Sequence, residues 1–281
     1  MSRQFALAAL TAIDLTPPEL VSAAARIGFD AVGLRLNPFR AGELQHPMFN
    51  NSPMLRETEA RLHDTGVAVL DIEVMRLSVG QDVQALLPVL ETGHRLGAKY
   101  ALTLIDIADL PHAAAKFAEL CALAEPLGIT CVLEFAVWLG VGSIQVASAV
   151  IQQAQQTNGA LLLDPFHLFR SGGQVADISA VNPQLIPYAQ FCDASGIAPA
   201  TIAAISDEAR FDRRLPGEGG LPLQAFVAAL PQDVPLSLEV PNRQLALTVD
   251  LDERLRRTLA AARKVVHGLS EGKLQSQCKP Q

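Results

Sequence analysis

The chain has 281 residues, of which 49% are hydrophobic and 18% are charged, and its formal net charge is -7. This composition is typical of a globular protein and excludes a largely disordered one. The negative charge argues against a general affinity for nucleic acid, because surfaces that bind nucleic acid are basic.

Strand and helix patterns alternate along the chain. The first strand is predicted from Phe5 to Leu10. A helix follows, because Thr16-Pro17-Pro18-Glu19 combines a capping box with proline in the first turn, and Gly28 ends it. The next strands are predicted over residues 31–36, 67–74, 100–105, 129–135, 160–164, 187–192 and 236–240. Helices are predicted over residues 53–65, 83–96, 112–127, 144–157, 223–230 and 251–269, with a weak helical signal near Ile178.

This alternation predicts an α/β fold, a single-domain (β/α)8 TIM barrel over residues 1–269. A doubly wound open sheet would show a glycine fingerprint after its first strand, and residues 11–18 contain no glycine. Residues 270–281 are polar and lack periodicity, which indicates a polar C-terminal tail.

Cysteine usage and the apolar runs indicate the cellular compartment. The four cysteines show no Cys-x-x-Cys spacing, which fits a reducing environment. The apolar run near the N-terminus is brief, and Asp14 follows it before any cleavage segment typical of a secretory signal. No window approaches the roughly 18 apolar residues of a membrane span. We therefore expect a cytoplasmic protein without a membrane partner.

Four side chains with oxygen donors follow apolar runs near the carboxyl ends of four consecutive predicted strands. They are Glu134, Asp164, Gln190 and Glu239. In a barrel these strand ends meet, and a buried charge there is costly unless it is paired. Three carboxylates and an amide predict a site for one divalent metal ion, with Mg or Mn favoured and Co or Zn as alternatives. The competing interpretation is that each residue caps a loop amide.

The segments that carry these donors resemble a known superfamily. They are Leu133-Glu134-Phe135, Leu163-Asp164-Pro165-Phe166-His167, Ala189-Gln190-Phe191-Cys192-Asp193, Leu215-Pro216-Gly217-Glu218-Gly219 and Ser237-Leu238-Glu239-Val240. Their order and spacing are similar to those of the xylose isomerase-like TIM barrel superfamily, in its sugar phosphate isomerase/epimerase branch. The likeness covers nearly the whole chain.

The resemblance implies roles for several residues. Glu134 and Glu239 would be both metal ligands and the catalytic acid/base pair. Asp164 would bind the metal, Gln190 would take the place of a histidine or glutamine ligand, and His167 would contact the substrate. An arginine before the Pro-Gly-x-Gly turn could also reach the substrate; Arg213 is our candidate, and Arg210 and Arg214 are the alternatives.

Four other residues are candidates for substrate contact. Glu73 and Arg35 end predicted strands on the active-site rim, where they could bind substrate hydroxyls or form a buried salt bridge with each other. Trp138 follows Glu134 and could pack against the apolar face of a sugar or close a lid. His167 could donate a hydrogen bond to a substrate oxygen or be bonded into its loop.

Three function classes stay open. The first is a metal-dependent isomerase or epimerase of a small sugar, ketose or inosose-type substrate, acting by proton abstraction α to a carbonyl and an enediolate intermediate. The second is a metal-dependent dehydratase of the 3-dehydroshikimate or inosose type. The third is an endonuclease IV-like nuclease, which the negative charge and the absence of histidines at the predicted strand ends disfavour. We expect a sugar-like small molecule as partner, and association into a homo-oligomer stays open.

Overall fold

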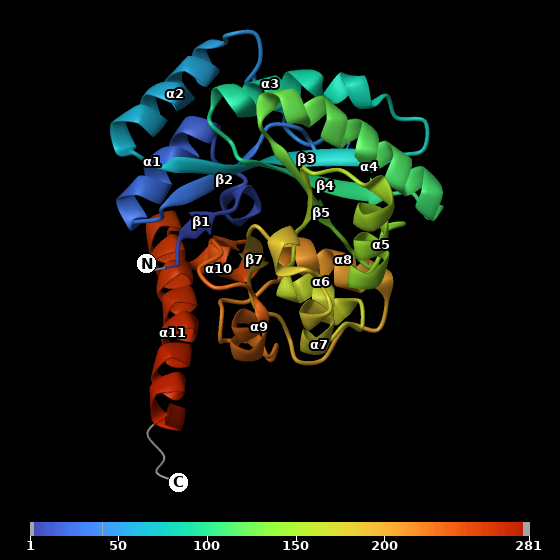
Figure 1. Cartoon of the computed structure of the whole chain (residues 1–281). Coiled ribbons are helices and arrows are strands. Elements are labelled where there is room, and N and C mark those ends of the chain that lie inside the picture. Colours follow the sequence, from blue (N-terminus) through green and yellow to red (C-terminus); the bar gives the residue numbers. More distant parts are fainter. Residues whose placement is uncertain (1–2, 41, 278–281) are drawn as a thin grey trace.

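Eight parallel strands curl into a barrel, and helices cover its outer surface (Figure 1). The structure, a computed structural model, describes residues 3–40 and 42–277, with side chains up to residue 268. The strands are β1 (Phe5–Leu7), β2 (Ala31–Arg35), β3 (Ala68–Ser78), β4 (Tyr100–Asp106), β5 (Thr130–Glu134), β6 (Gly159–Leu161), β7 (Ala189–Phe191) and β8 (Leu236–Leu238). The predicted TIM barrel is confirmed.

The strands pair in the order β6-β5-β4-β3-β2-β1-β8-β7. The barrel closes between β6 and β7 through a parallel bridge of Leu163 and Ala189, beside which the Gln190 N–H donates to the Leu163 carbonyl at 2.9 Å. This closure brings the carboxyl ends of β5, β6, β7 and β8 around one mouth of the barrel.

The α-helices fill the connections between the strands. They are α1 (Pro17–Ile27), α2 (Pro53–Thr65), α3 (Leu87–Arg95), α4 (Leu110–Ala124), α5 (Ile144–Ala154), α6 (Pro165–Arg170), α7 (Val175–Ser179), α8 (Ile202–Phe211), α9 (Leu223–Ala229), α10 (Arg243–Thr248) and α11 (Leu251–Gln277). Helix α1 begins as predicted, since the Glu19 carboxylate accepts a hydrogen bond from the Thr16 N–H at 2.9 Å. Gly28, with φ of 90°, ends it in the left-handed region that glycine tolerates.

Several predicted boundaries were wrong. Strand β1 ends at Leu7, three residues before the predicted end, because residues Ala9–Ala12 form a 3-10 helix. Strands β6, β7 and β8 are shorter than predicted, since their last residues leave the ladder to enter site loops. Helices α6, α8 and α10 were not predicted, and α11 continues to Gln277 instead of ending at residue 269.

The apolar core has two parts. The larger part lies between the barrel and its helices and includes Phe117, Leu133 and Phe226, each with 0% exposure. The second part fills the inside of the barrel with small and branched residues such as Ala6, Leu102 and Val132. Because apolar side chains occupy the barrel interior, the buried polar groups of β5 to β8 concentrate toward the carboxyl end.

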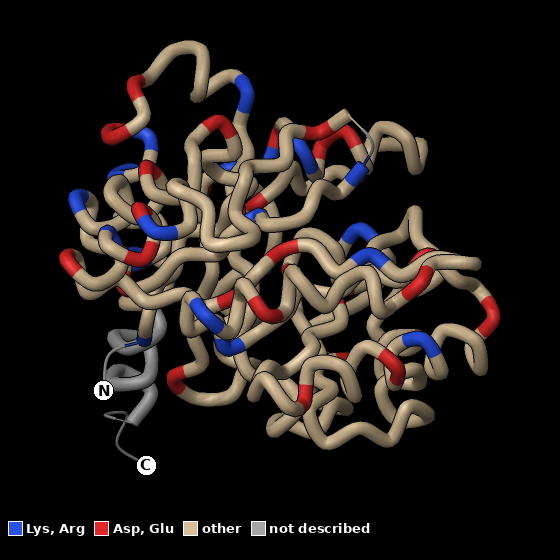
Figure 2. The backbone as a smooth tube through the Cα atoms, turned by 90° about the horizontal axis from the view of Figure 1, so that it is seen from above, with Lys and Arg blue, Asp and Glu red and all other residues tan. Residues whose placement is uncertain are grey.

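Two general features concern the surface. Acidic and basic residues are interspersed over the view in Figure 2, without a continuous basic face. Among the helices of the described residues, none combines the length and the apolar character that a membrane span requires.

Gly140 fixes the loop between β5 and α5 against the loop that follows β4. A Cβ atom at Gly140 would lie 2.3 Å from the carbonyl carbon of Ile107 and 2.6 Å from the backbone nitrogen of Ala108. We therefore expect Gly140→Ala to lower the free energy of unfolding by about 1–3 kcal/mol, because backbone atoms must move. Urea denaturation would measure this loss.

The matched control is Gly196→Ala, whose Cβ would meet its nearest neighbour, the Cα of Gly220, at an ordinary 3.5 Å. We expect the control to unfold near the wild-type midpoint. Equal midpoints for both variants would contradict the close approach at Gly140.

Candidate active site

The four predicted oxygen donors meet at the carboxyl ends of β5 to β8. Glu134 is the last residue of β5, Asp164 caps α6 after β6, Gln190 lies in β7, and Glu239 follows β8. Glu134 and Glu239 are each 5% exposed, and Asp164 and Gln190 are 0% exposed. Three carboxyl groups buried this deeply require compensating charge or hydrogen bonds.

Arg213 supplies the positive charge. Its Nη1 pairs with Asp164 Oδ2, and its Nη2 lies 2.8 Å from Glu239 Oε2. Its Nε donates to the carbonyl of Ala209 in α8 at 2.8 Å, so the helix holds the guanidinium in place. Of the three candidate arginines, Arg213 therefore reaches the carboxylates, whereas Arg214 is exposed.

The Asp164 side chain is held from three directions. Besides Arg213, the N–H of Phe166 donates to Oδ1 at 2.7 Å, and the Cys192 thiol lies 3.6 Å from the same oxygen. Burial acts to raise the pKa of Asp164, but the charge of Arg213 and the hydrogen bonds from Arg213 and from the Phe166 N–H hold it below its usual value. Asp164 is thus an ionised carboxylate at neutral pH.

The pKa values of the two glutamates are shifted in the opposite direction to that of Asp164. Burial, with the negative charges of Glu239 and Asp164, raises the pKa of Glu134 well above its usual value. Burial also raises the pKa of Glu239 to about 7, since the Arg213 charge offsets it only in part and Glu73 adds to it. Carboxyl groups whose pKa is raised by burial hold a proton more readily than exposed ones, and such groups can act as acids and bases.

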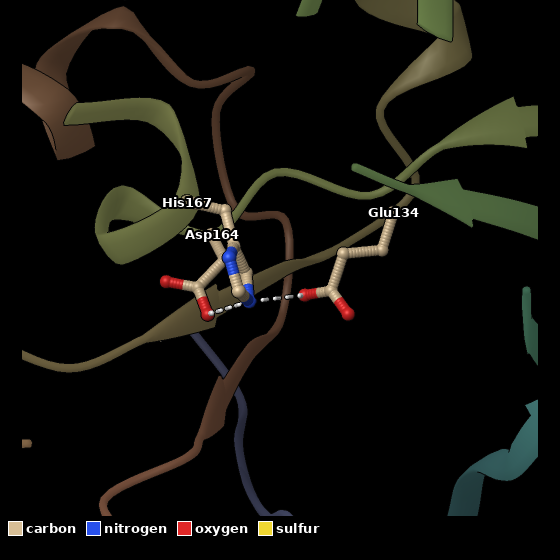
Figure 3. Close-up of side chains that lie close together, drawn as sticks. All are labelled: Glu134, Asp164 and His167. Carbon is tan, nitrogen blue, oxygen red and sulfur yellow. Dashed lines mark ion pairs between the residues drawn. The ribbon is translucent and has the colours of Figure 1, made fainter. Parts of the chain in front are cut away.

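His167 lies between two of the carboxylates, as Figure 3 shows. Its Nε2 is 3.9 Å from Glu134 Oε1 and 3.8 Å from Asp164 Oδ2. Burial lowers the pKa of His167 to about 4, so the ring is neutral at neutral pH and these contacts are not ion pairs. The Trp138 ring packs edge-on against His167, with centroids 5.3 Å apart.

The donor set fits a divalent cation. Among the described residues, the buried atoms Glu134 Oε1 and Gln190 Oε1 have no hydrogen-bond partner, while Gln190 Nε2 donates to Glu239 Oε1 at 3.1 Å. Glu134, Asp164 and His167 each offer a ligand atom within 4.8 Å of the others. Buried oxygens without donors are what a hard cation binds, whereas Arg213 already occupies one oxygen each of Asp164 and Glu239.

All five residues predicted to contact the substrate line one cavity of about 80 Å³. Its walls include Glu73, Arg35, Trp138, His167 and Arg213 together with the two glutamates. The sequence did not decide whether Arg35 and Glu73 pair with each other. In the structure they form a salt bridge, with Arg35 Nη2 3.0 Å from Glu73 Oε2. Both residues still line the cavity, and Glu73 Oε1 has no hydrogen-bond partner in the described part of the chain.

Sequence reasoning missed helix α8 and one buried pair. Ser206 of α8 lines the cavity beside Arg210, which was named only as an alternative to Arg213. The apolar spacing of Ile202, Ile205 and Ala209 after the capping Thr201 could have revealed this helix. The buried pair of Asp71 and Tyr188, which share a hydrogen bond inside the barrel, had no local signal because the two residues are far apart in sequence.

Comparisons with known proteins agree with this architecture. The family model for the xylose isomerase-like TIM barrel matches residues 21–265. A 3-dehydroshikimate dehydratase of Pseudomonas aeruginosa is 29% identical over 258 residues, which are 86% of this chain and 38% of that protein. The chain thus spans well under half the length of this curated relative.

Solved structures are similar in fold at low identity. A fusion protein of a xylose isomerase-like TIM barrel and a 4-hydroxyphenylpyruvate dioxygenase has a TM-score of 0.81 at 20% identity, over 100% of this chain and 45% of its own. The IOLI protein with a bound zinc atom has a TM-score of 0.78 at 18% identity, over 95% and 99% of the two chains. D-psicose 3-epimerase of Clostridium cellulolyticum, solved with D-tagatose, has a TM-score of 0.73 at 14% identity, over 95% and 99%.

The family model covers most of the chain and includes the strand ends that carry all four oxygen donors. The chain therefore belongs to the xylose isomerase-like TIM barrel family.

Proposed function

We propose that this protein is a metal-dependent enzyme that removes and returns a proton on the carbon beside a carbonyl group, as an isomerase or epimerase of a small sugar-like substrate. The observation that carries the proposal is the pair Glu134 and Glu239, two buried carboxyl groups with raised pKa that face one cavity. The epimerases and the dehydratase among the similar proteins support an enzyme.

The proposed metal ligands are Glu134, Asp164, Gln190 and Glu239, with His167 within reach of the first two. Oxygen ligands favour Mg or Mn, and the histidine keeps Zn and Co as alternatives. A divalent cation bound here would stabilise the negative charge that develops on a carbonyl oxygen when the adjacent proton leaves.

The side chains would divide the remaining work. One glutamate, in its ionised form, removes the proton, and the other delivers a proton to the same or the neighbouring carbon. Neutral His167 can donate a hydrogen bond to a substrate oxygen without adding a positive charge. Trp138 covers His167 and helps to keep water out of the small cavity.

A dehydratase is the second candidate, and one observation favours it. The curated relative named 3-dehydroshikimate dehydratase matches 86% of this chain. The same base would remove the proton next to the carbonyl, and a hydroxyl on the following carbon would then leave as water once it has received a proton from the second glutamate.

Substitution of the glutamates tests the shared step. We expect Glu134→Gln and Glu239→Gln each to lower turnover by about 10²–10⁴-fold and to abolish exchange of the substrate α-hydrogen with deuterated water, because an amide is not a base. The substrates to screen with Mn are D-tagatose, D-psicose, an inosose and 3-dehydroshikimate. An isomeric product identifies the isomerase or epimerase, and a conjugated product absorbing in the ultraviolet identifies the dehydratase.

Two comparisons make the result specific. Glu57→Gln, in the exposed part of α2, should keep wild-type turnover. Asp164→Asn should lose activity that excess metal partly restores, since this residue is proposed only to bind the ion. Near-normal turnover of either site glutamine variant at saturating metal would show that its glutamate is not an acid or base.

The role of Arg213 can be tested through stability. Removing its charge with Arg213→Met leaves the carboxylates of Asp164 and Glu239 buried without a counterion, which costs about 3–5 kcal/mol. A divalent cation would replace that charge, so we expect added Mn to raise the Tm of Arg213→Met much more than that of the wild type.

Differential scanning fluorimetry with Mn and with EDTA measures both effects. The neighbouring Arg214→Met is the matched control, because Arg214 is exposed and should respond to Mn as the wild type does. An equal Mn-induced shift in all three proteins would mean that the cation does not use the carboxylates that Arg213 holds.

A further inference from the structure

A second, larger cavity of about 630 Å³ opens beside the candidate active site. Its walls are the segments that follow β1, β2 and β8, together with the end of α8. It shares five lining residues with the small cavity that contains the glutamates, namely Leu10, Arg35, Arg40, Glu43 and Arg210. A ligand whose reacting carbon lies at the glutamates can therefore extend into the larger cavity.

The larger cavity is basic, although the protein as a whole is acidic. Its lining holds five arginines, which are Arg35, Arg40, Arg210, Arg243 and Arg254, against two acids, Asp14 and Glu43. Glu43 already lies 3.6 Å from Arg35 and 3.2 Å from Arg40. In the part of the chain that the structure describes, Arg210, Arg243 and Arg254 form no ion pair with a carboxylate.

Arg210 is the unpaired arginine that lines both cavities. Its Nε donates to the Ser206 carbonyl at 2.8 Å and its Nη2 donates to Ser206 Oγ at 2.9 Å, so one turn of α8 orients the guanidinium. These bonds use two of its five N–H groups, and the planar fork can present others to a ligand. Orientation before binding reduces the entropy cost of an ionic contact.

Two further observations indicate that the positive charge of the cavity is only partly compensated. Burial and the nearby charge of Arg40 lower the pKa of Arg210, and the charges of Asp207 and Glu43 offset this only in part. Arg254 presents a buried Nε without a hydrogen-bond partner among the described residues. An anion in the cavity would relieve the repulsion and satisfy such donors.

We propose that Arg210, assisted by Arg40, binds an anionic group of the substrate, a carboxylate or a phosphate, while the reacting carbon lies between Glu134 and Glu239. The inference rests on the proposed function and narrows its substrate to acids or phosphate esters of sugar-like compounds. Arginine suits both groups, because its fork matches two oxygens at once.

Calorimetric titration of the Mn-loaded protein tests the inference. Every protein in the test carries Glu134→Gln, so that no ligand is turned over during the titration. The ligands are 3-dehydroshikimate, which carries a carboxylate, D-fructose 6-phosphate, which carries a phosphate, and neutral D-tagatose. We expect at least one anionic ligand to bind more than about tenfold tighter than D-tagatose, and Arg210→Gln to remove at least that advantage. Arg210→Lys should restore part of it, since lysine keeps the charge without the fork.

Arg214→Gln is the matched control, since this exposed arginine lies three residues from the end of α8 and lines neither cavity. Its affinity for all three ligands should equal that of the protein with Glu134→Gln alone. If Arg210→Gln weakens the binding of 3-dehydroshikimate alone, the site binds carboxylates. If it weakens the binding of D-fructose 6-phosphate alone, the site binds phosphates. If neither anionic ligand binds tighter than D-tagatose, or if Arg210→Gln binds them as Arg214→Gln does, the inference is wrong.

The proposed function is judged separately, by exchange of the α-hydrogen with deuterated water in the wild-type protein. If the α-hydrogen exchanges but the affinity for the anionic ligands does not depend on Arg210, only the proposal of the anion site is wrong. If anion binding requires Arg210 but no ligand exchanges its α-hydrogen, the anion site is supported and the proposed proton transfer is contradicted.

Discussion

The ion pairs of Arg213 with Asp164 and Glu239 are the interaction on which the rest of the site depends. Four carboxyl groups, those of Glu73, Glu134, Asp164 and Glu239, are buried at one mouth of the barrel, and a low-dielectric interior does not tolerate such charge without counterions. Arg213 links the ends of β6 and β8 to α8 and lets Asp164 stay ionised. Burial raises the pKa of Glu134 and of Glu239, and the charge of Arg213 offsets this only in part.

The closed parallel barrel determines where this cluster forms. Every strand presents its carboxyl end to the same mouth, so side chains at the ends of different strands meet there, above an interior that is largely apolar. The loops then complete the enclosure, with Trp138 packed on His167 and Gly140 in close approach to the loop after β4. Rigid strands and tightly packed loops together hold these side chains in fixed positions.

Charge is distributed differently in the two adjoining cavities. The small one contains the glutamates that are the proposed metal ligands and acid/base pair, whereas the large one is lined by arginines with few acidic partners. A substrate with an anionic group would be oriented by the second cavity while its carbonyl end enters the first. If both proposals hold, this arrangement would separate substrate recognition from proton transfer and would explain a basic cavity in a protein with a net charge of -7.

The sequence by itself determined the (β/α)8 fold and the positions of the four oxygen donors, because hydrophobic period and strand-end placement are local patterns. The capping box that begins α1 and the glycine that ends it, Gly28, are also signals carried by neighbouring residues. Only the tertiary structure decided that Arg213, and not Arg214, meets Asp164, and that Arg35 pairs with Glu73. The arginine-lined cavity likewise draws on segments after β1, β2 and β8 and on the end of α8, which local periodicity cannot relate to one another. Such contacts join residues far apart in sequence, so their geometry is set by barrel closure and loop packing.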